Sequence, residues 1–463
     1  MKRNQIAAWI LLVLLLTPVM PAQAQSQGPI YIIQEGDTLT SIAGTFGTTV
    51  DALLTANGIQ ETTILVPGTS LVIPGFGGVQ GVLTTQTIEF GETIDSFGLR
   101  YGVDTEALIR LNRIVRPERL YAGQALIMTQ SESSPEQSGA SRVLSGRGEG
   151  ILAISVREGV NPWSLHTFEG DQRLWVIPSD VLISSQSDEP LTALPDPIVS
   201  TNLHPSPAVQ GHTLIIRIDL AQSGWVAGQL DEDQLNFFPE GERSMVSLHG
   251  IHAMTDPGLY DLEISLYTTL GEAPTYSFVQ PIRVLDGGYY SENIIGVPAE
   301  TVDPAVIDPE QEMVEALLAP ATPDRMWAGP FQLPSDYYTE EFISVFGTRR
   351  NYNLGALYYY HTGVDLYGQT GVEIMASAPG VVVFAGPLSI RGNATYIDHG
   401  WGVYSGYFHQ SEIRVSEGET VEAGQVIGLI GSTGRSTGAH LHWEIWVGGV
   451  PVDPLDWIER SYP

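Results

Sequence analysis

An internal repeat constrains the N-terminal part of this chain more than any other feature. The stretch EGDTLTSIAGTFGTTVDALLTANGI, which begins at Glu35, aligns without a gap with FGETIDSFGLRYGVDTEALIRLNRI, which begins at Phe90. The offset is 55 residues, and it pairs Gly36 with Gly91 and Asn57 with Asn112. Because self-similarity at a fixed offset indicates a repeated structural unit, we expect two copies of one small module.

Each copy predicts the order strand, helix, helix, strand. In the first copy, Thr38 precedes apolar residues at helical spacing, a second helix is expected over 50–56, and PGTSLVIP closes the unit as a strand. This pattern resembles the lysin-motif (LysM) family. The resemblance implies βααβ modules at 29–75 and, in divergent form, at 85–129, and binding to N-acetylglucosamine-containing glycans such as peptidoglycan. Whether the second copy binds glycan or only has a structural role stays open.

The first residues have the pattern of a secretory signal peptide. A short cationic start (MKRNQ) precedes an apolar run (IAAWILLVLLLTPVM) and the small-residue site AQA. The run is short for a membrane span and contains Pro18, so we expect cleavage after residue 24 rather than an uncleaved anchor. The mature protein is therefore expected to be secreted, extracytoplasmic and associated with the cell wall, without contact with a membrane.

Composition narrows the possible partners and the possible chemistry. The formal net charge is −32, which makes nucleic acid and anionic lipid poor partners. The chain has no cysteine, so a disulfide framework, a thiolate metal site and a cysteine nucleophile are all excluded. Any metal here must be bound by nitrogen and oxygen ligands. The oligomeric state cannot be inferred.

The middle of the chain is predicted to be rich in β-strands. A polar linker is expected at 130–143, and apolar runs such as GILAISV, HTLIIRIDL and LYDLEISLYTT then alternate with turns over 144–286. We interpret this range as an antiparallel, immunoglobulin-like β-sandwich. An acidic, proline-rich linker is expected at 287–330, with one short helix at EQEMVEALL. This linker could lie over the active site and offer a ligand to its metal, or it could be a plain connection.

The C-terminal region, 331–463, combines an all-β pattern with five of the ten histidines. His440 and His442 are two residues apart, so on a strand both side chains project from the same face. His361 and Asp365 are four apart in an extended segment, which also places them on one side. Two imidazoles and a carboxylate form a three-ligand set for a tetrahedral zinc ion and leave one position open for water.

The order of motifs in this region resembles the lysostaphin/LytM group of zinc peptidases. The resemblance is carried by FGTRR, HTGVDLYG, IDHGWGVYSGYFH and GSTGRSTGAHLHWEI. It implies an all-β lysostaphin-like domain that cleaves peptide bonds of peptidoglycan, with one Zn²⁺ bound by His361, Asp365 and His442. It further implies that His440 acts as general base or orients the attacking water, and that His409 hydrogen-bonds the oxyanion. For His399 we expect a turn-stabilising role.

Three classes of function stay open at this point. The leading hypothesis is a secreted zinc endopeptidase that its LysM modules tether to peptidoglycan. The alternatives are a non-catalytic, peptidoglycan-binding regulator of other wall hydrolases, and a scaffold with a vestigial last domain. All three predicted ligands and both additional histidines are present, which favours the enzyme. Manganese or cobalt could replace zinc on the same ligands.

Overall fold

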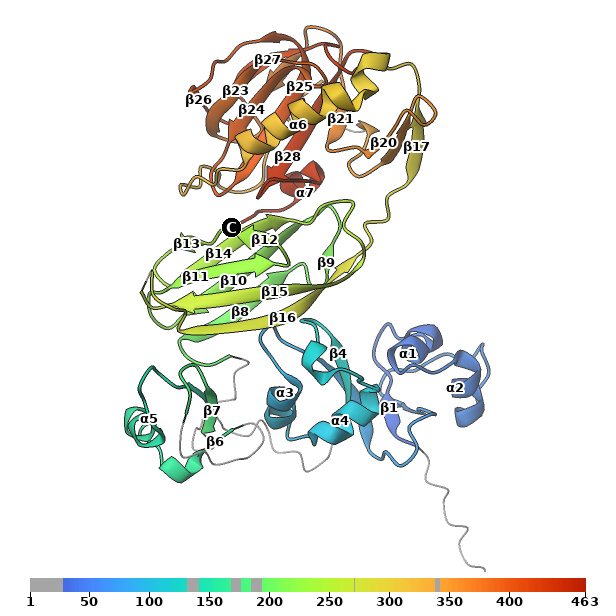
Figure 1. Ribbon diagram of the computed structural model, residues 1–463. Helices are drawn as coiled ribbons and strands as arrows, with labels where there is room; N and C mark the ends of the chain where they lie inside the picture. Colours follow the sequence, from blue (N-terminus) through green and yellow to red (C-terminus); the bar gives the residue numbers. More distant parts are fainter. Residues whose placement is uncertain (1–27, 131–140, 168–175, 185–193, 270, 338–341) are drawn as a thin grey trace, which may run out of the picture. The chain divides into compact units, whose positions relative to one another are not determined.

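The computed structural model describes residues 28–130, 141–167, 176–184, 194–269, 271–337 and 342–463 (Figure 1). The predicted signal peptide and most of the linker predicted at 130–143 lie outside these residues. The described chain divides into two compact units, one comprising 28–85 and 127–130 and the other comprising the remainder. Among these residues, no helix combines the length and the apolarity needed to cross a lipid bilayer.

Both repeat copies have the element order β-α-α-β. The first contains β1 (Ile30–Ile32), α1 (Leu39–Thr45), α2 (Val50–Asn57) and β2 (Ser70–Val72), and the second contains β3 (Val82–Thr87), α3 (Ile94–Tyr101), α4 (Thr105–Asn112) and β4 (Ala125–Gln130). Thr38 and Thr93 occupy equivalent positions, and each closes a capping box that satisfies the free amides at a helix start. The repeat in sequence is therefore a repeat in structure.

A small unit follows the second copy and contains a helix where the sequence predicted a strand. It comprises β5 (Ser141–Leu144), α5 (Ile151–Glu158), the 3₁₀ turn η2 (Pro162–Ser164), β6 (Leu165–His166) and β7 (Val181–Ser184). The GILAISV run forms α5, because Ile151 and Ile154 share one helix face and Gly159 ends the helix in the left-handed conformation. The strand prediction for this run was wrong, since a short apolar run alone does not distinguish a strand from a helix.

Two sheets enclose a common apolar core over 198–285. One has the order β13-β14-β10-β8 and the other β12-β11-β15-β16-β9. Their bounds are β8 (Ile198–His204), β9 (Ala208–Val209), β10 (Thr213–Leu220), β11 (Trp225–Leu230), β12 (Asp233–Leu235), β13 (Phe238–Glu240), β14 (Ser244–Gly250), β15 (Gly258–Tyr267) and β16 (Tyr276–Leu285). Side chains along β10 alternate between buried and partly buried, as expected for a strand with one face on the core. The immunoglobulin-like classification stays a prediction.

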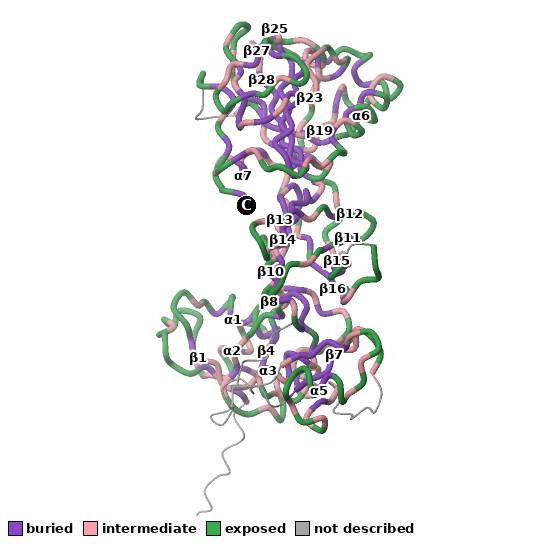
Figure 2. Tube along the Cα trace, turned by 90° about the vertical axis from the view of Figure 1, so that its left-hand side faces the viewer, coloured by how far each residue is buried: buried purple, intermediate pink, exposed green. Residues whose placement is uncertain are grey.

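The C-terminal domain is built on a ten-stranded sheet with the central order β18-β21-β28-β25-β24-β23-β26. The strands of the domain are β18 (Phe342–Ser344), β19 (Arg349–Tyr352), β20 (Leu357–Tyr360), β21 (Val364–Tyr367), β22 (Glu373–Met375), β23 (Gly380–Leu388), β24 (Gly392–Asp398), β25 (Val403–Ile413), β26 (Thr420–Val421), β27 (Val426–Ile430), β28 (His440–Val447) and β29 (Val450–Val452), and helix α7 (Pro454–Glu459) follows them. The central strands are buried along most of their length (Figure 2).

The range expected to be a linker before this domain is instead an ordered part of it. It contains β17 (Ser291–Ile294), the 3₁₀ turn η3 (Ala299–Val302) and helix α6 (Pro304–Leu318), which is longer than the short helix predicted there. β17 pairs in parallel with β19, and α6 lies against the strands of the large sheet (Figure 1). Val314 and Leu318, four residues apart on one helix face, are buried against Tyr404 and Trp446. This apolar stripe is the physical reason why the segment packs on the sheet.

Candidate active site

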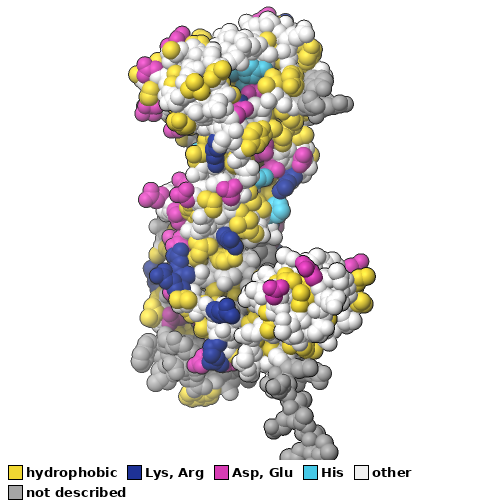
Figure 3. All heavy atoms as spheres, turned by 90° about the vertical axis from the view of Figure 1, so that its right-hand side faces the viewer, with side chains coloured by type: hydrophobic (Ala, Val, Ile, Leu, Met, Phe, Trp, Pro, Cys, Tyr) yellow, Lys and Arg dark blue, Asp and Glu magenta, His cyan; other side chains and the backbone are white. Residues whose placement is uncertain are grey.

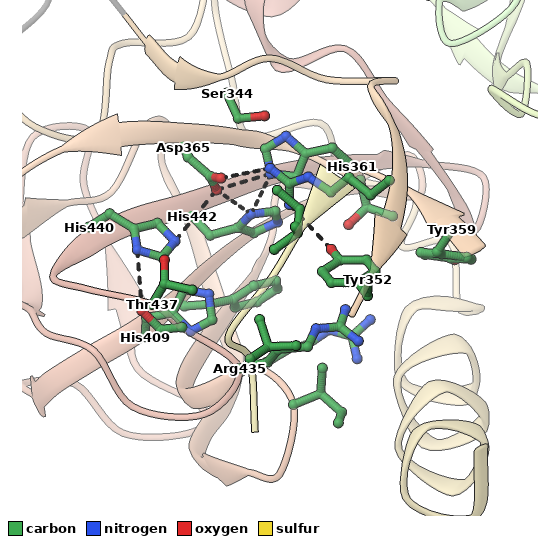
Figure 4. A pocket seen from close by; sticks show the side chains of 18 of the residues that line it. Ser344, Tyr352, Tyr359, His361, Asp365, His409, Arg435, Thr437, His440 and His442 are labelled. Carbon is green, nitrogen blue, oxygen red and sulfur yellow. Dashed lines mark hydrogen bonds and ion pairs between the residues drawn. The ribbon is translucent and has the colours of Figure 1, made fainter. Parts of the chain in front are cut away.

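The three predicted metal ligands converge between two neighbouring strands. Asp365 on β21 lies directly opposite His442 on β28, and His361 lies in the turn between β20 and β21. Asp365 Oδ1 is 3.0 Å from His361 Nε2 and 2.8 Å from His442 Nδ1, and the two nitrogens are 3.0 Å apart (Figure 4). All three side chains are buried.

The hydrogen bonds on the far side of each ring fix which nitrogen faces the cluster. His361 Nδ1 donates to the carbonyl of Val345 at 2.9 Å, and His442 Nε2 donates to the Glu444 carboxylate at 3.0 Å. Since a neutral imidazole carries one proton, the other nitrogen of each ring presents a lone pair to the same point, beside an Asp365 oxygen. Three converging lone pairs repel one another unless a cation lies between them. The ligand types and their number fit zinc, around which ligand atoms at about 2.0–2.2 Å would be roughly 3.3 Å apart.

The protonation of the cluster follows from its burial and its neighbours. Burial lowers the pKa of His361 to about 4, so this ring is neutral near pH 7. Burial also lowers the pKa of His442, but hydrogen bonds to Asp365 and Glu444 raise it by more. Burial alone would raise the pKa of Asp365, yet the adjacent His361 and His442 hold it well below its usual range. A proton and a metal ion would therefore compete for the same lone pair on His442.

A second layer of charged side chains, which was not predicted from the sequence, holds the ligands. Arg350 Nη2 donates to Asp365 Oδ2 at 3.0 Å, and its Nε donates to Glu292 of β17 at 2.9 Å. Glu444 also accepts hydrogen bonds from Thr362 and, at 2.6 Å, from the indole of Trp446. Glu444 continues the two-residue alternation of His440 and His442, so the strand pattern could have revealed it. No sequence signal points to Glu292, which is 58 residues from Arg350.

His440 and His409 line the same cavity of about 470 Å³ as the three ligands. Their ring centroids are 4.7 Å apart. His440 Nδ1 donates to the carbonyl of Gly438 at 2.9 Å, which leaves its Nε2 free as an acceptor 3.7 Å from Asp365 Oδ1. A group of histidine side chains is visible on the C-terminal domain, at the top of the view in Figure 3.

His409 is held in a strained position at an irregular part of β25. Its φ of 58° is in the left-handed region, which non-glycine residues adopt at a cost of about 1–3 kcal/mol. Its Nδ1 donates to the carbonyl of Thr433 at 2.8 Å, so Nε2 of the neutral ring is an acceptor. Burial, followed by repulsion from His440 and His442, keeps the pKa of His409 well below its usual range.

The remaining histidines do not join the cluster. His399 is buried between the carbonyl of Pro379 and the hydroxyl of Ser405, at 2.7 Å from each, and does not line the cavity. Among the described residues, His361, Asp365 and His442 form the one group arranged to hold a metal ion. The five histidines of the middle region are thus outside any such group.

The segment before the catalytic strands forms one wall of the cavity. The residues of this segment that line the cavity include Ile294, Val297, Ile307, Asp308 and Gln311. Within the described part of 287–330, no carboxylate joins the ligand cluster, and Glu292 contacts Arg350 instead. The segment therefore shapes the site from its side, and the hypothesis that it supplies a further metal ligand has no support in this geometry.

Comparisons with known proteins identify both predicted domain types. The model of peptidase family M23 matches residues 359–454, and the model of the LysM domain matches 31–74 and 87–129. The predicted resemblances to LysM modules and to zinc peptidases of the lysostaphin group are therefore confirmed at the level of the domain families.

Several proteins are similar to the C-terminal domain. The DD-carboxypeptidase/endopeptidase Mpg of Neisseria meningitidis is 42% identical over 127 residues, which are 27% of this chain and 29% of that protein. Peptidoglycan DD-endopeptidase ShyA of Vibrio cholerae is 42% identical over 95 residues, 20% of this chain and 22% of that protein. Murein hydrolase activator NlpD of Salmonella dublin is 40% identical over 109 residues, 23% of this chain and 29% of that protein.

The chain thus spans less than a third of the length of these relatives. Among solved structures, the peptidase lysostaphin from Staphylococcus simulans is 34% identical, with a TM-score of 0.21. That match covers 21% of this chain and 44% of lysostaphin.

Proposed function

We propose that this chain, which carries a peptidase M23 domain and two LysM domains, is a zinc-dependent endopeptidase of peptidoglycan. It would act outside the cytoplasm, on peptide bonds of the stems or cross-bridges. The observation that carries the proposal is the convergence of three lone pairs, from His361, Asp365 and His442, beside a cavity lined by two further histidines. The relatives named peptidases and peptidoglycan endopeptidases support the same reaction class.

In this proposal each side chain has a distinct task. His361, Asp365 and His442 would hold one zinc ion, which supplies a Lewis acid for the scissile carbonyl and lowers the pKa of a water. Arg350 and Glu444 keep the ligands in their orientation. His440 accepts a proton at Nε2, the nitrogen that its bond to Gly438 leaves free.

His409 has the same tautomer as His440, and this refines its predicted role. Because Nδ1 donates to Thr433 and the pKa of His409 is held well below its usual range, Nε2 of the neutral ring is an acceptor. His409 would therefore accept a hydrogen bond from the attacking water, beside His440, rather than donate one to an oxyanion. The LysM domains would hold the enzyme on its polymeric substrate and raise the local concentration of scissile bonds.

The test uses the chain without residues 1–24, purified with and without added Zn²⁺. We expect one zinc per chain, clearing of a cell-wall suspension, and released muropeptides whose masses identify the bond that is cut. A chelator and the His442→Ala substitution should each abolish clearing. His204→Ala, at an exposed histidine of the middle region, is the matched control and should retain it. Full clearing by His442→Ala would refute the zinc mechanism.

A second candidate is a non-catalytic activator of other wall hydrolases, because one similar protein is named a murein hydrolase activator. This candidate predicts that the chain releases no muropeptides by itself, whether or not it binds zinc. It would instead increase the release by a separate hydrolase added to the same suspension. The muropeptide assay therefore separates the two candidates directly.

A further inference from the structure

Three arginines line the cavity beside the metal-ligand cluster, and two of them are neutralised by carboxylates. Arg350 is paired with Asp365 and Glu292. Arg391 donates to Glu310 of α6 at 3.0 Å. Each of these cations thus has an acidic partner within the domain itself.

Arg435 is the third arginine of the cavity, and it differs from the other two because it forms no ion pair with a carboxylate among the described residues. Its Nη1 donates to the carbonyl of Thr301 at 3.1 Å, and its guanidinium lies 4.8 Å from the ring centroid of Tyr352. Burial lowers the pKa of Arg435 and the nearby Arg391 and Arg350 lower it further, while Tyr352 and Glu310 offset only part of this decrease. A half-buried cation in contact with a ring and a carbonyl gains strongly from an added anion.

We propose that Arg435 binds a free carboxylate of the substrate peptide while the scissile bond lies at the metal cluster. This inference rests on the proposed peptidase function and adds a specificity determinant to it. Stem peptides of peptidoglycan carry free carboxylates close to their cross-links, and a guanidinium matches a carboxylate with two parallel hydrogen bonds. Arg435 then selects substrates that have an ionised group at this subsite over their amidated counterparts.

The competing explanation is that Arg435 serves an acidic residue of the protein itself. Asp308 of α6 is the one candidate that also lines the cavity without an ion pair among the described residues. If Asp308 were the partner of Arg435 in solution, neutralising either residue would have the same effect. Asp308→Asn is therefore the matched control for Arg435→Gln.

The experiment measures kcat/KM of the full mature chain on two cross-linked muropeptides that differ only in whether the stem carboxylates are free or amidated. The native protein should cleave the free-acid substrate roughly 10- to 100-fold better, as expected for loss of a charge-assisted hydrogen bond. Arg435→Gln should lose this preference and retain its activity on the amidated substrate. Arg435→Lys should keep part of the preference, and Asp308→Asn should keep all of it.

Bound zinc, measured for every variant, shows that the site is intact. Equal cleavage of both substrates by the native chain, or an unchanged preference in Arg435→Gln, would overturn the assignment of Arg435 while leaving the peptidase in place. Equal loss of preference in Asp308→Asn and Arg435→Gln would overturn it in favour of the internal pair. Cleavage of neither substrate by the zinc-loaded native chain would instead refute the proposed function.

A separate observation concerns two loops of each LysM copy. One follows the first strand and contains Gly36 in the first copy and Gly91 in the second, and the other precedes the last strand and contains Gly68 or Gly123. These equivalent loops have different surroundings in the two copies. In the first copy, a Cβ atom added at Gly36 or Gly68 would meet nothing within 4 Å. Ile64 and Val66, beside Gly68, are 85% and 54% exposed. The two loops of the first copy therefore present backbone and apolar side chains to solvent.

In the second copy the same two loops contact the β-sandwich. The amide of Gly91 donates to the side chain of Gln280 on β16 at 2.5 Å, and the Gln280 amide donates to the carbonyls of Glu92 and Leu120 at 3.1 and 3.4 Å. An added Cβ at Gly91 would lie 2.4 Å from Leu194, and one at Gly123 would lie 2.6 Å from Ser206.

The exposed apolar residues Ile64 and Val66 of the first copy have counterparts in the second copy that contact the sandwich. Residues 64 and 66 correspond to Arg119 and Tyr121 at the offset of 55. Arg119 pairs with Asp261 of the sandwich at 3.0 Å, and Tyr121 accepts a hydrogen bond from Arg283. The second copy has thus exchanged exposed apolar side chains for polar ones that reach β15 and β16.

The structure assigns the two loops of the second copy to its joint with the sandwich, so that only the first copy keeps them available for the glycan that the LysM resemblance implies. This inference rests on the proposed glycan binding.

Calorimetric titration of the full mature chain with an N-acetylglucosamine oligomer should give one site per chain. Ile64→Asp should abolish that site. Val115→Asp, at a residue of the second copy that is 90% exposed, should leave it unchanged. Two sites per chain, or a site that persists in Ile64→Asp, would overturn the division of roles without affecting the peptidase.

Discussion

Glu444 acts on the proposed metal through His442, and its effect can be measured apart from catalysis. Its carboxylate accepts the Nε2 proton of His442, which fixes the tautomer that presents Nδ1 to the cluster. We expect Glu444→Gln to weaken zinc binding roughly 10- to 100-fold, because the amide can turn its NH₂ group to the ring and stabilise the wrong tautomer. Competition with a chromogenic chelator measures this affinity. Glu412→Gln, at an exposed position on β25, should have no effect.

Substitution of His440 should lower the catalytic rate, whereas substitution of His361 should remove the bound metal. His440→Ala should retain zinc and lose about 100-fold or more in kcat, since general base catalysis contributes roughly 10²–10⁴-fold. His361→Ala should lose zinc itself. Metal content and kcat measured on the same preparations separate the two, and loss of zinc from His440→Ala would show that His440 is a ligand.

The site residues differ in how far the sequence could reveal them. His440 and His442 could be placed on one strand face because alternation along a strand is a local rule. The left-handed backbone of His409 could not be foreseen, since its φ of 58° depends on how β25 shifts register against its neighbours. Arg350 and Glu292 belong to the site only because β17 pairs with β19, a contact that no local pattern encodes.

Among the elements, α6 is the one whose role differs most from the prediction. The sequence indicated a linker, because prolines and acidic residues together make up eleven of the 26 residues over 298–323. Only some of the apolar residues of α6 are buried: Val314 and Leu318 are 0% and 1% exposed, whereas Met313 is 40% exposed. Composition averages over both faces of a helix and therefore hides a single buried stripe.

The packing of α6 predicts a large effect for one substitution on its buried face. Leu318→Ala should lower the free energy of unfolding by about 2–5 kcal/mol, as expected for a leucine truncated in a core. Met313→Ala, on the same helix but 40% exposed, should change it by about 0.5 kcal/mol or less. Urea denaturation followed by tryptophan fluorescence gives both values. Equal effects of the two substitutions would mean that α6 does not pack on the sheet in solution.

At the scale of the whole molecule, the sequence predicted the domain families better than the connections between them. The LysM and peptidase families could be identified from short motifs, because each motif lies within one domain. The joint of the second LysM copy could not, since Gln280 is 189 residues from Gly91 and carries no motif. Contacts between domains depend on surface side chains, which local periodicity does not constrain.

The division into two compact units predicts that zinc stabilises one part of the chain and not the other. A ligand that binds only the folded state stabilises it by RT ln(1 + [L]/Kd), about 4 kcal/mol at a thousandfold excess over Kd. The ligand cluster lies in the unit that contains 86–126 and the C-terminal domain, and no tryptophan occurs in 28–85. Tryptophan fluorescence therefore follows only the zinc-binding unit, whereas amide resonances of 28–85 follow the first LysM copy.

On heating with a chelator, the midpoint of unfolding measured by fluorescence should fall by roughly 8–16 °C relative to the zinc-loaded protein. The midpoint of the first copy should not move, because no metal ligand lies within it. A shift of both midpoints by the same amount would mean that the two units unfold as one, and no shift of either would mean that the cluster does not bind zinc.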